Sequence, residues 1–96
     1  MSETIEKAVA ALNDRLGGAG FDAVAKFVLE GAGNIVIDER GARAGDDQAD
    51  VTMTASADVF EQILAGDLNP TAAFMSGKLA IDGDMGAAMR LGGLLA

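Results

Sequence analysis

The first apolar stripe along the chain has helical spacing. Ile5, Val9, Leu12 and Leu16 recur every three or four residues, which places them on one face of a helix over residues 3–16. Charged and small residues occupy most of the other positions. The pattern therefore predicts a helix that packs against a core by one side only.

Strands are predicted where apolar and polar residues alternate. The segments with this pattern are 25–29, 34–38, 50–55 and 78–82, with a shorter one near 42–44. In the third of them, Val51, Met53 and Ala55 face one way and Thr52 and Thr54 the other. Such alternation is typical of an antiparallel sheet with one packed face and one face in water.

The second half of the chain carries start and stop signals for three helices. Ser56 is the predicted N-cap of a helix that Gly66 closes, and Asn69 caps a short helix with Pro70 at its first position. A last helix is predicted from Asp84 onward. Helices and strands do not alternate regularly, so we expect an α+β domain over residues 1–96, with about five largely antiparallel strands and helices on one face.

The last helix has more apolar residues than one flat sheet can cover. From residue 85 to 95 they are spread around most of the helix and interrupted by three glycines. The residues that make up this apolar surface are Met85, Ala88, Met89, Leu91, Leu94 and Leu95. We expect a ligand, a partner chain or another element to cover what the sheet leaves bare.

Composition excludes several classes of function. The chain has fifteen acidic residues and seven scattered basic ones, which give a net charge of −8. This charge argues against binding of nucleic acid and against strong docking to anionic membranes. The chain has no His and no Cys, so it lacks the commonest general base, the commonest metal ligand and any thiolate. We expect no enzyme activity, no metal and no cofactor.

The N-terminal residues mix charged with small side chains, and no apolar run is long enough to span a bilayer. We therefore predict a cytoplasmic protein without stable membrane insertion, although transient apolar contact with a membrane stays open. The carboxylates at Asp82 and Asp84 lack the spacing of a calcium loop and are interpreted as a turn that starts the last helix.

The stretch ADVTMTASADVFEQILAGDLNPTAAFMSGKLAIDGDMGAAMRLGGLL, residues 49–95, resembles the second half of the sterol carrier protein type 2 domain. The resemblance rests on a combined string of positions rather than on any single motif. Those positions are Asp50, Phe60, Leu64, Gly66, Asn69-Pro70, Phe74, Gly77-Lys78-Leu79, Ile81, Gly83, Met85 and Met89.

The resemblance implies an apolar tunnel between the sheet and its helices. It also implies that the tunnel binds long-chain lipids such as fatty acids, acyl-CoA, sterol-like molecules or isoprenoid lipids, with low selectivity. By matching positions, the tunnel lining would be Phe60, Ile63, Leu64, Phe74, Met75, Met85 and Met89, closed by Leu91, Leu94 and Leu95.

Two functions are weighed on this basis. The first is intracellular binding or transfer of a lipid-like ligand. The second is an accessory interaction module, either a dimerising scaffold or a component of isoprenoid-quinone biosynthesis, that uses the same apolar surface on a partner chain. The sequence leaves the ligand and the oligomeric state open.

Overall fold

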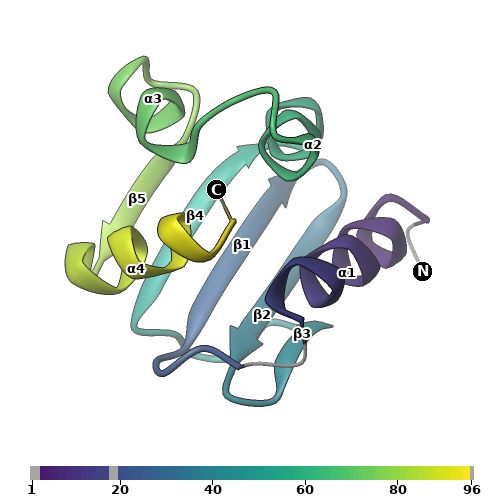
Figure 1. Ribbon diagram of the computed structural model, residues 1–96. Helices are drawn as coiled ribbons and strands as arrows, with labels where there is room; N and C mark the ends of the chain where they lie inside the picture. Colours follow the sequence, from purple (N-terminus) through teal and green to yellow (C-terminus); the bar gives the residue numbers. More distant parts are fainter. Residues whose placement is uncertain (1–2, 18–19, 96) are drawn as a thin grey trace.

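The computed structural model describes residues 3–17 and 20–95. They form a five-stranded sheet with four helices (Figure 1). The elements in chain order are α1 (Glu3–Leu16), β1 (Ala25–Glu30), β2 (Gly33–Asp38), β3 (Gly41–Ala44), β4 (Val51–Ser56), α2 (Ala57–Ala65), α3 (Pro70–Met75), β5 (Ala80–Gly83) and α4 (Met85–Leu95). The predicted α+β class and every predicted element are confirmed, with the last strand beginning two residues later than expected.

The strands are ordered β3-β2-β1-β4-β5 across the sheet. Three of the four neighbouring pairs are antiparallel, as predicted, and β1 and β4 run parallel. The parallel pair arises because the chain leaves the β3 edge and returns beside β1 on its other side. This crossing is made by the polar loop 45–50.

The polar loop also changes the burial of one strand residue. The alternation in residues 34–38 predicts that Val36 lies on the face open to water, yet it is fully buried. A Cβ on Gly45 would lie 3.6 Å from the Val36 side chain, and Asp46 in the same loop accepts a hydrogen bond from Lys26 Nζ at 2.8 Å. The loop thus covers this part of the open face, which a strand pattern cannot show.

The helix ends follow the predicted capping residues. Ser56 Oγ accepts a hydrogen bond from Val59 N at 3.2 Å, and Asn69 Oδ1 accepts one from Thr71 N at 2.8 Å. Asp84 Oδ1 accepts from the backbone N–H of Ala87 at 3.1 Å and so starts α4. Asp84 of the carboxylate pair therefore begins the last helix, as predicted, whereas Asp82 lies within β5.

All four helices lie on the same side of the sheet (Figure 1). α1 packs over β2 and β3, whereas α4 packs over β4 and β5, and α2 and α3 lie toward one end of the strands. The core lies between the two layers. Its floor is the inward row of strand residues, in which Phe27 is opposite both Ile35 and Met53, and Met53 is opposite Ile81.

Candidate functional site

A pocket opens between the sheet and the helices α2, α3 and α4. Its floor is the row formed by Phe27, Met53 and Ile81, because the register of β1, β4 and β5 brings these three inward residues side by side. Ile63 of α2 and Leu79, just before β5, extend the wall. Every one of these side chains is apolar, so the inner part of the pocket can hold only an apolar group.

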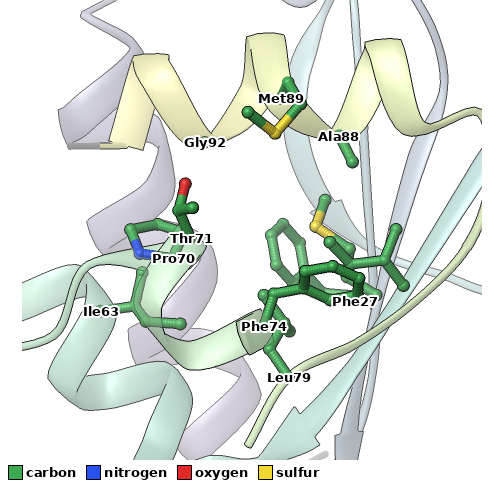
Figure 2. Close-up of a pocket in the computed structure, with 11 residues that line it drawn as sticks. Phe27, Ile63, Pro70, Thr71, Phe74, Leu79, Ala88, Met89 and Gly92 are labelled. Atoms are coloured by element: carbon green, nitrogen blue, oxygen red, sulfur yellow. The ribbon is translucent and has the colours of Figure 1, made fainter. Parts of the chain in front are cut away.

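The mouth of the pocket lies between α3 and α4. Figure 2 shows Met89 and Ala88 on α4 facing Phe74 on α3 across the pocket. Phe74 is 39% exposed and Met89 is 59% exposed, so both side chains line the pocket and also reach its surface. These two side chains are placed where a ligand would pass between water and the interior.

The two helices approach closely at one end of the mouth. A Cβ on Gly92 would lie 3.7 Å from Cβ of Pro70, which is ordinary van der Waals contact. Thr71, on the next position of α3, supplies the one side-chain hydroxyl of the lining. None of the lining residues carries an ionisable group, so the pocket wall offers neither an acid nor a base to a bound molecule.

The pocket is narrow as it stands. The space within it that the centre of a water molecule can occupy is about 30 Å³. That is room for about two waters, and so for about two methylene groups. A longer hydrocarbon fits only if the wall moves or its side chains change rotamer.

The shifted pKa values lie away from this pocket. The hydrogen bond from the Arg43 guanidinium, followed by that from the Arg40 backbone N–H, lowers the pKa of Asp38. The hydrogen bond from Lys26 lowers the pKa of Asp46. These ion pairs join the polar loop and the β2–β3 edge, where they serve the fold rather than the pocket.

Ten residues were predicted to line a tunnel, and the structure brings three of them to the pocket. These are Ile63, Phe74 and Met89. Met75, Met85 and Leu94 lie on the surface outside its lining, with exposed fractions of 81%, 42% and 43%. The Leu95 side chain lies outside the described part of the chain.

The other three predicted residues are also outside the pocket lining. Leu91 is fully buried in the core. Phe60 is also fully buried and meets the ring of Phe27 edge to face, with the ring centroids 4.8 Å apart. With Leu64, Phe60 borders a separate shallow groove between α1 and α2 that also includes Leu29. The Phe27–Phe60 pair therefore separates the pocket from this groove.

Eight lining residues were not predicted as site residues. They are Phe27, Met53, Pro70, Thr71, Leu79, Ile81, Ala88 and Gly92. The alternating pattern already placed the strand residues of this set inward, and the row they form depends on the strand order. Gly92 follows Ala88 by four residues, so helical spacing could have placed the two on one face.

Two possible features are not found in the described ranges. No helix there is both long and apolar enough to cross a membrane. Acidic side chains nowhere gather there in a group of three that could hold a metal ion. The capping role of Asp84 accounts for the most suggestive acidic pair.

Comparison with known proteins identifies the family of this fold and pocket. The family model of the SCP-2 sterol transfer family matches residues 4–96. Hydroxysteroid dehydrogenase-like protein 2 of Xenopus laevis is 42% identical over 74 residues, which cover 69% of this chain and 18% of that protein. Peroxisomal multifunctional enzyme A of Dictyostelium discoideum is 40% identical over 78 residues, which cover 81% of this chain and 17% of that enzyme. The chain thus spans less than a fifth of these curated relatives.

Solved structures of similar length have the same fold. The sterol carrier protein domain 2 of Helicoverpa armigera superimposes with a TM-score of 0.78 at 27% identity, covering 96% of this chain and 85% of that one. Sterol carrier protein 2 of Aedes aegypti in complex with palmitate gives a TM-score of 0.77 at 25% identity, covering 100% of this chain and 97% of that one. The resemblance read from residues 49–95 is confirmed, and the chain belongs to the SCP-2 sterol transfer family.

Proposed function

We propose that this protein binds long-chain lipids, with a fatty acyl chain as the representative ligand, and carries them between sites. The observation that supports this most directly is the pocket between the sheet and α2, α3 and α4, whose lining is apolar except for the Thr71 hydroxyl. The solved Aedes aegypti relative, at 25% identity, is a complex with palmitate. We take the same ligand class for this chain, with residues 1–96 acting as one binding domain and with no catalytic step.

The ligand has to widen the pocket. Because the space present admits about two methylene groups, a longer chain can pass between Phe74 and Met89 only if α3 and α4 separate or these side chains change rotamer. α4 is suited to such movement because three of its eleven residues are glycine, at positions 86, 92 and 93. Each glycine in a helix interior costs about 1 kcal/mol relative to alanine. We therefore expect the tunnel between the sheet and the helices to form only when a ligand opens it.

The energetics suit a carrier of low selectivity. Burying the roughly fourteen methylene groups of palmitate yields about 11 kcal/mol at about 0.8 kcal/mol each. Association and ordering remove several kcal/mol of that. Micromolar affinity is therefore reached without a polar anchor. Two ligands that differ by one methylene group are discriminated only weakly, because neither leaves a buried polar group of the pocket unpaired. The carboxylate of a fatty acid remains in water at the mouth.

The test is titration of the protein with palmitate in solution. Phe74→Asp and Met89→Asp place a charge at the mouth and should weaken binding at least about tenfold, because the hydrated carboxylate replaces apolar surface that would contact the acyl chain. Matched controls are Met75→Asp on α3 and Met85→Asp on α4, which add the same charge on the same helices outside the pocket lining. The controls should bind palmitate as the unmodified protein does.

Two results would contradict the proposal. One is wild-type affinity in both folded mouth variants, with circular dichroism as the check on folding. The other is failure of the unmodified protein to bind palmitate, an acyl-CoA or an isoprenoid quinone. That second result would favour the accessory interaction role.

A further inference from the structure

One side-chain hydroxyl lies in the otherwise apolar lining of the pocket. It belongs to Thr71, the second residue of α3. The backbone N–H of Thr71 donates a hydrogen bond to Asn69 Oδ1 at 2.8 Å, but no group in the described part of the chain pairs with the hydroxyl. The pocket therefore contains one side-chain oxygen that is available to a bound molecule.

The position of Thr71 at the start of α3 explains why its hydroxyl has no partner. Within a helix, a threonine hydroxyl commonly bonds to the carbonyl three or four residues earlier. α3 begins at Pro70, so the residues in those positions, Asp67 and Leu68, lie ahead of the helix. Thr71 is also exposed, so water reaches its hydroxyl when the pocket is empty.

The hydroxyl is directed into the mouth of the pocket. Figure 2 shows it pointing from α3 toward α4, beside Gly92. Gly92 has no side chain, so α4 places no bulky group over the hydroxyl. Phe74 follows Thr71 by three residues and thus lies on the same face of α3, one turn further along. A lipid that passes between Phe74 and Met89 would therefore have the Thr71 hydroxyl within reach of one end.

The pocket lining offers a lipid head group no cation. Arg90 of α4 is directed elsewhere, because its Nε lies 3.3 Å from Asp22 Oδ1 and its guanidinium is 5.9 Å from the centre of the Phe21 ring. Neither of these partners lines the pocket, and Lys78, which follows α3, does not line it either. Among the lining side chains, the Thr71 hydroxyl is thus the hydrogen-bond donor that the head group can meet.

The floor of the pocket determines which end of a lipid enters first. A head group placed among Phe27, Met53 and Ile81 would be buried without a hydrogen-bond partner, which is strongly disfavoured. The hydrocarbon tail therefore occupies the floor, and the head group stays at the mouth with Thr71.

We propose that the Thr71 hydroxyl donates a hydrogen bond to an oxygen acceptor of the lipid head group, either a carboxylate or a carbonyl, and thereby selects lipids whose head carries such an acceptor. This inference rests on the proposed lipid-carrier function. The bond replaces one that the exposed hydroxyl makes to water, so its contribution to affinity is small. Its effect is to fix the position of the head group and to discriminate against head groups that accept no hydrogen bond.

The test compares two soluble ligands whose hydrocarbon chains are closely similar in length, by calorimetric titration of the full chain below their critical micelle concentrations. Laurate has a carboxylate acceptor, and dodecyltrimethylammonium has none. Thr71→Val replaces the hydroxyl with a methyl group of similar size. It should weaken laurate binding about threefold to tenfold, the net worth of one hydrogen bond, and should not weaken binding of dodecyltrimethylammonium.

Two control variants separate the hydroxyl from the shape of the side chain. Thr71→Ser keeps the hydroxyl and should bind laurate as the unmodified protein does. Thr54→Val makes the same exchange on β4, on the sheet face that points away from the helices and outside the pocket lining, and should leave binding of both ligands unchanged. Urea midpoints check that all three variants are folded.

The position of the bound lipid gives a second measurement. Laurate labelled with carbon-13 at one end or the other reports its neighbours through nuclear Overhauser effects. The terminal methyl group should contact the Met53 methyl group, and the methylene beside the carboxylate should contact the Thr71 methyl group. The reverse pair of contacts would overturn the proposed orientation.

The Thr71 contact and the carrier function fail in different measurements. Laurate binding by folded Thr71→Val that equals that of the unmodified protein, or an equal loss for both ligands, overturns the role of the hydroxyl and leaves the carrier function in place. Failure of the unmodified protein to bind either laurate or palmitate overturns both.

Discussion

Phe60 is predicted to set the length of chain that the pocket accepts. Its ring packs on Phe27, which lines the pocket, and it also borders the groove between α1 and α2. Phe60→Ala removes this wall and should join the two spaces. The variant should then bind a hydrocarbon long enough to occupy both.

The change in stability follows from the burial of the ring. Phe60 is 0% exposed, and replacing a buried Phe with Ala costs about 3–5 kcal/mol. A 96-residue domain has a free energy of unfolding of roughly 5–14 kcal/mol at about 0.05–0.15 kcal/mol per residue. Urea denaturation at low temperature should therefore show a folded but strongly destabilised variant. Ligand at about 100 times its Kd should return about 2.7 kcal/mol of stability.

The change in ligand preference is the sharper measurement. Each further buried methylene contributes about 0.8 kcal/mol, so a fatty acid two methylenes longer than palmitate should gain about tenfold in affinity for the variant relative to palmitate. The unmodified protein should show a smaller gain because the Phe27–Phe60 pair blocks the extension. Competition titration with the two fatty acids measures the ratio directly.

A control separates this effect from general loss of stability. Leu12 is a fully buried residue of α1 and borders neither space, so Leu12→Ala should lose about 2–5 kcal/mol without a change in chain-length preference. The reasoning is refuted if folded Phe60→Ala keeps the wild-type preference. If Phe60→Ala lowers the free energy of unfolding by less than about 1 kcal/mol, the argument from packing of the ring is refuted.

Three further predictions concern stability. The hydrogen bond from Arg43 lowers the pKa of Asp38 in the folded protein. The stability that this carboxylate contributes is therefore present above the unfolded pKa of about 3.9 and is lost as the pH falls through the folded pKa. Asp38→Asn should destabilise the protein at neutral pH, and the urea midpoints of the variant and the unmodified protein should converge below the folded pKa. Gly93→Ala should raise the free energy of unfolding by about 0.5–1 kcal/mol, because a Cβ there meets nothing within 4 Å and α4 gains helix propensity; an unchanged or lower thermal midpoint would contradict this. Ser56→Ala should cost about 1 kcal/mol through loss of the hydrogen bond from Val59 N, with Ser56→Thr as the variant that retains it in chemical denaturation.

The sequence by itself determined the elements and the class of fold. Apolar spacing in 3–16 and alternation in 50–55 depend on the geometry of single helices and strands, and the caps at Ser56 and Asn69 act on their own first turns. These signals are local, so they were predicted almost to the residue. The family also followed from the string in residues 49–95, and the family model confirms it.

The excess of apolar residues on the last helix was also visible in the sequence. The residue pattern predicted that α4 could not be covered by the sheet, and Met85, Met89 and Leu94 are exposed in the structure. Which of these would face the pocket could not be predicted, because it depends on how far α4 rotates and where α3 lies beside it. Only Met89 of the three is part of the lining.

The tertiary structure decided the contents of the pocket. Phe27, Met53 and Ile81 are far apart in the chain and meet only because β4 pairs with β1 in parallel and with β5 in antiparallel register. The burial of Val36 depends likewise on the loop that crosses the open face. Strand order and loop path are set by the whole chain, since each pairing must satisfy the backbone hydrogen bonds and the burial of its neighbours together. A periodic pattern records which way a residue points, and the packed structure decides which residues it meets.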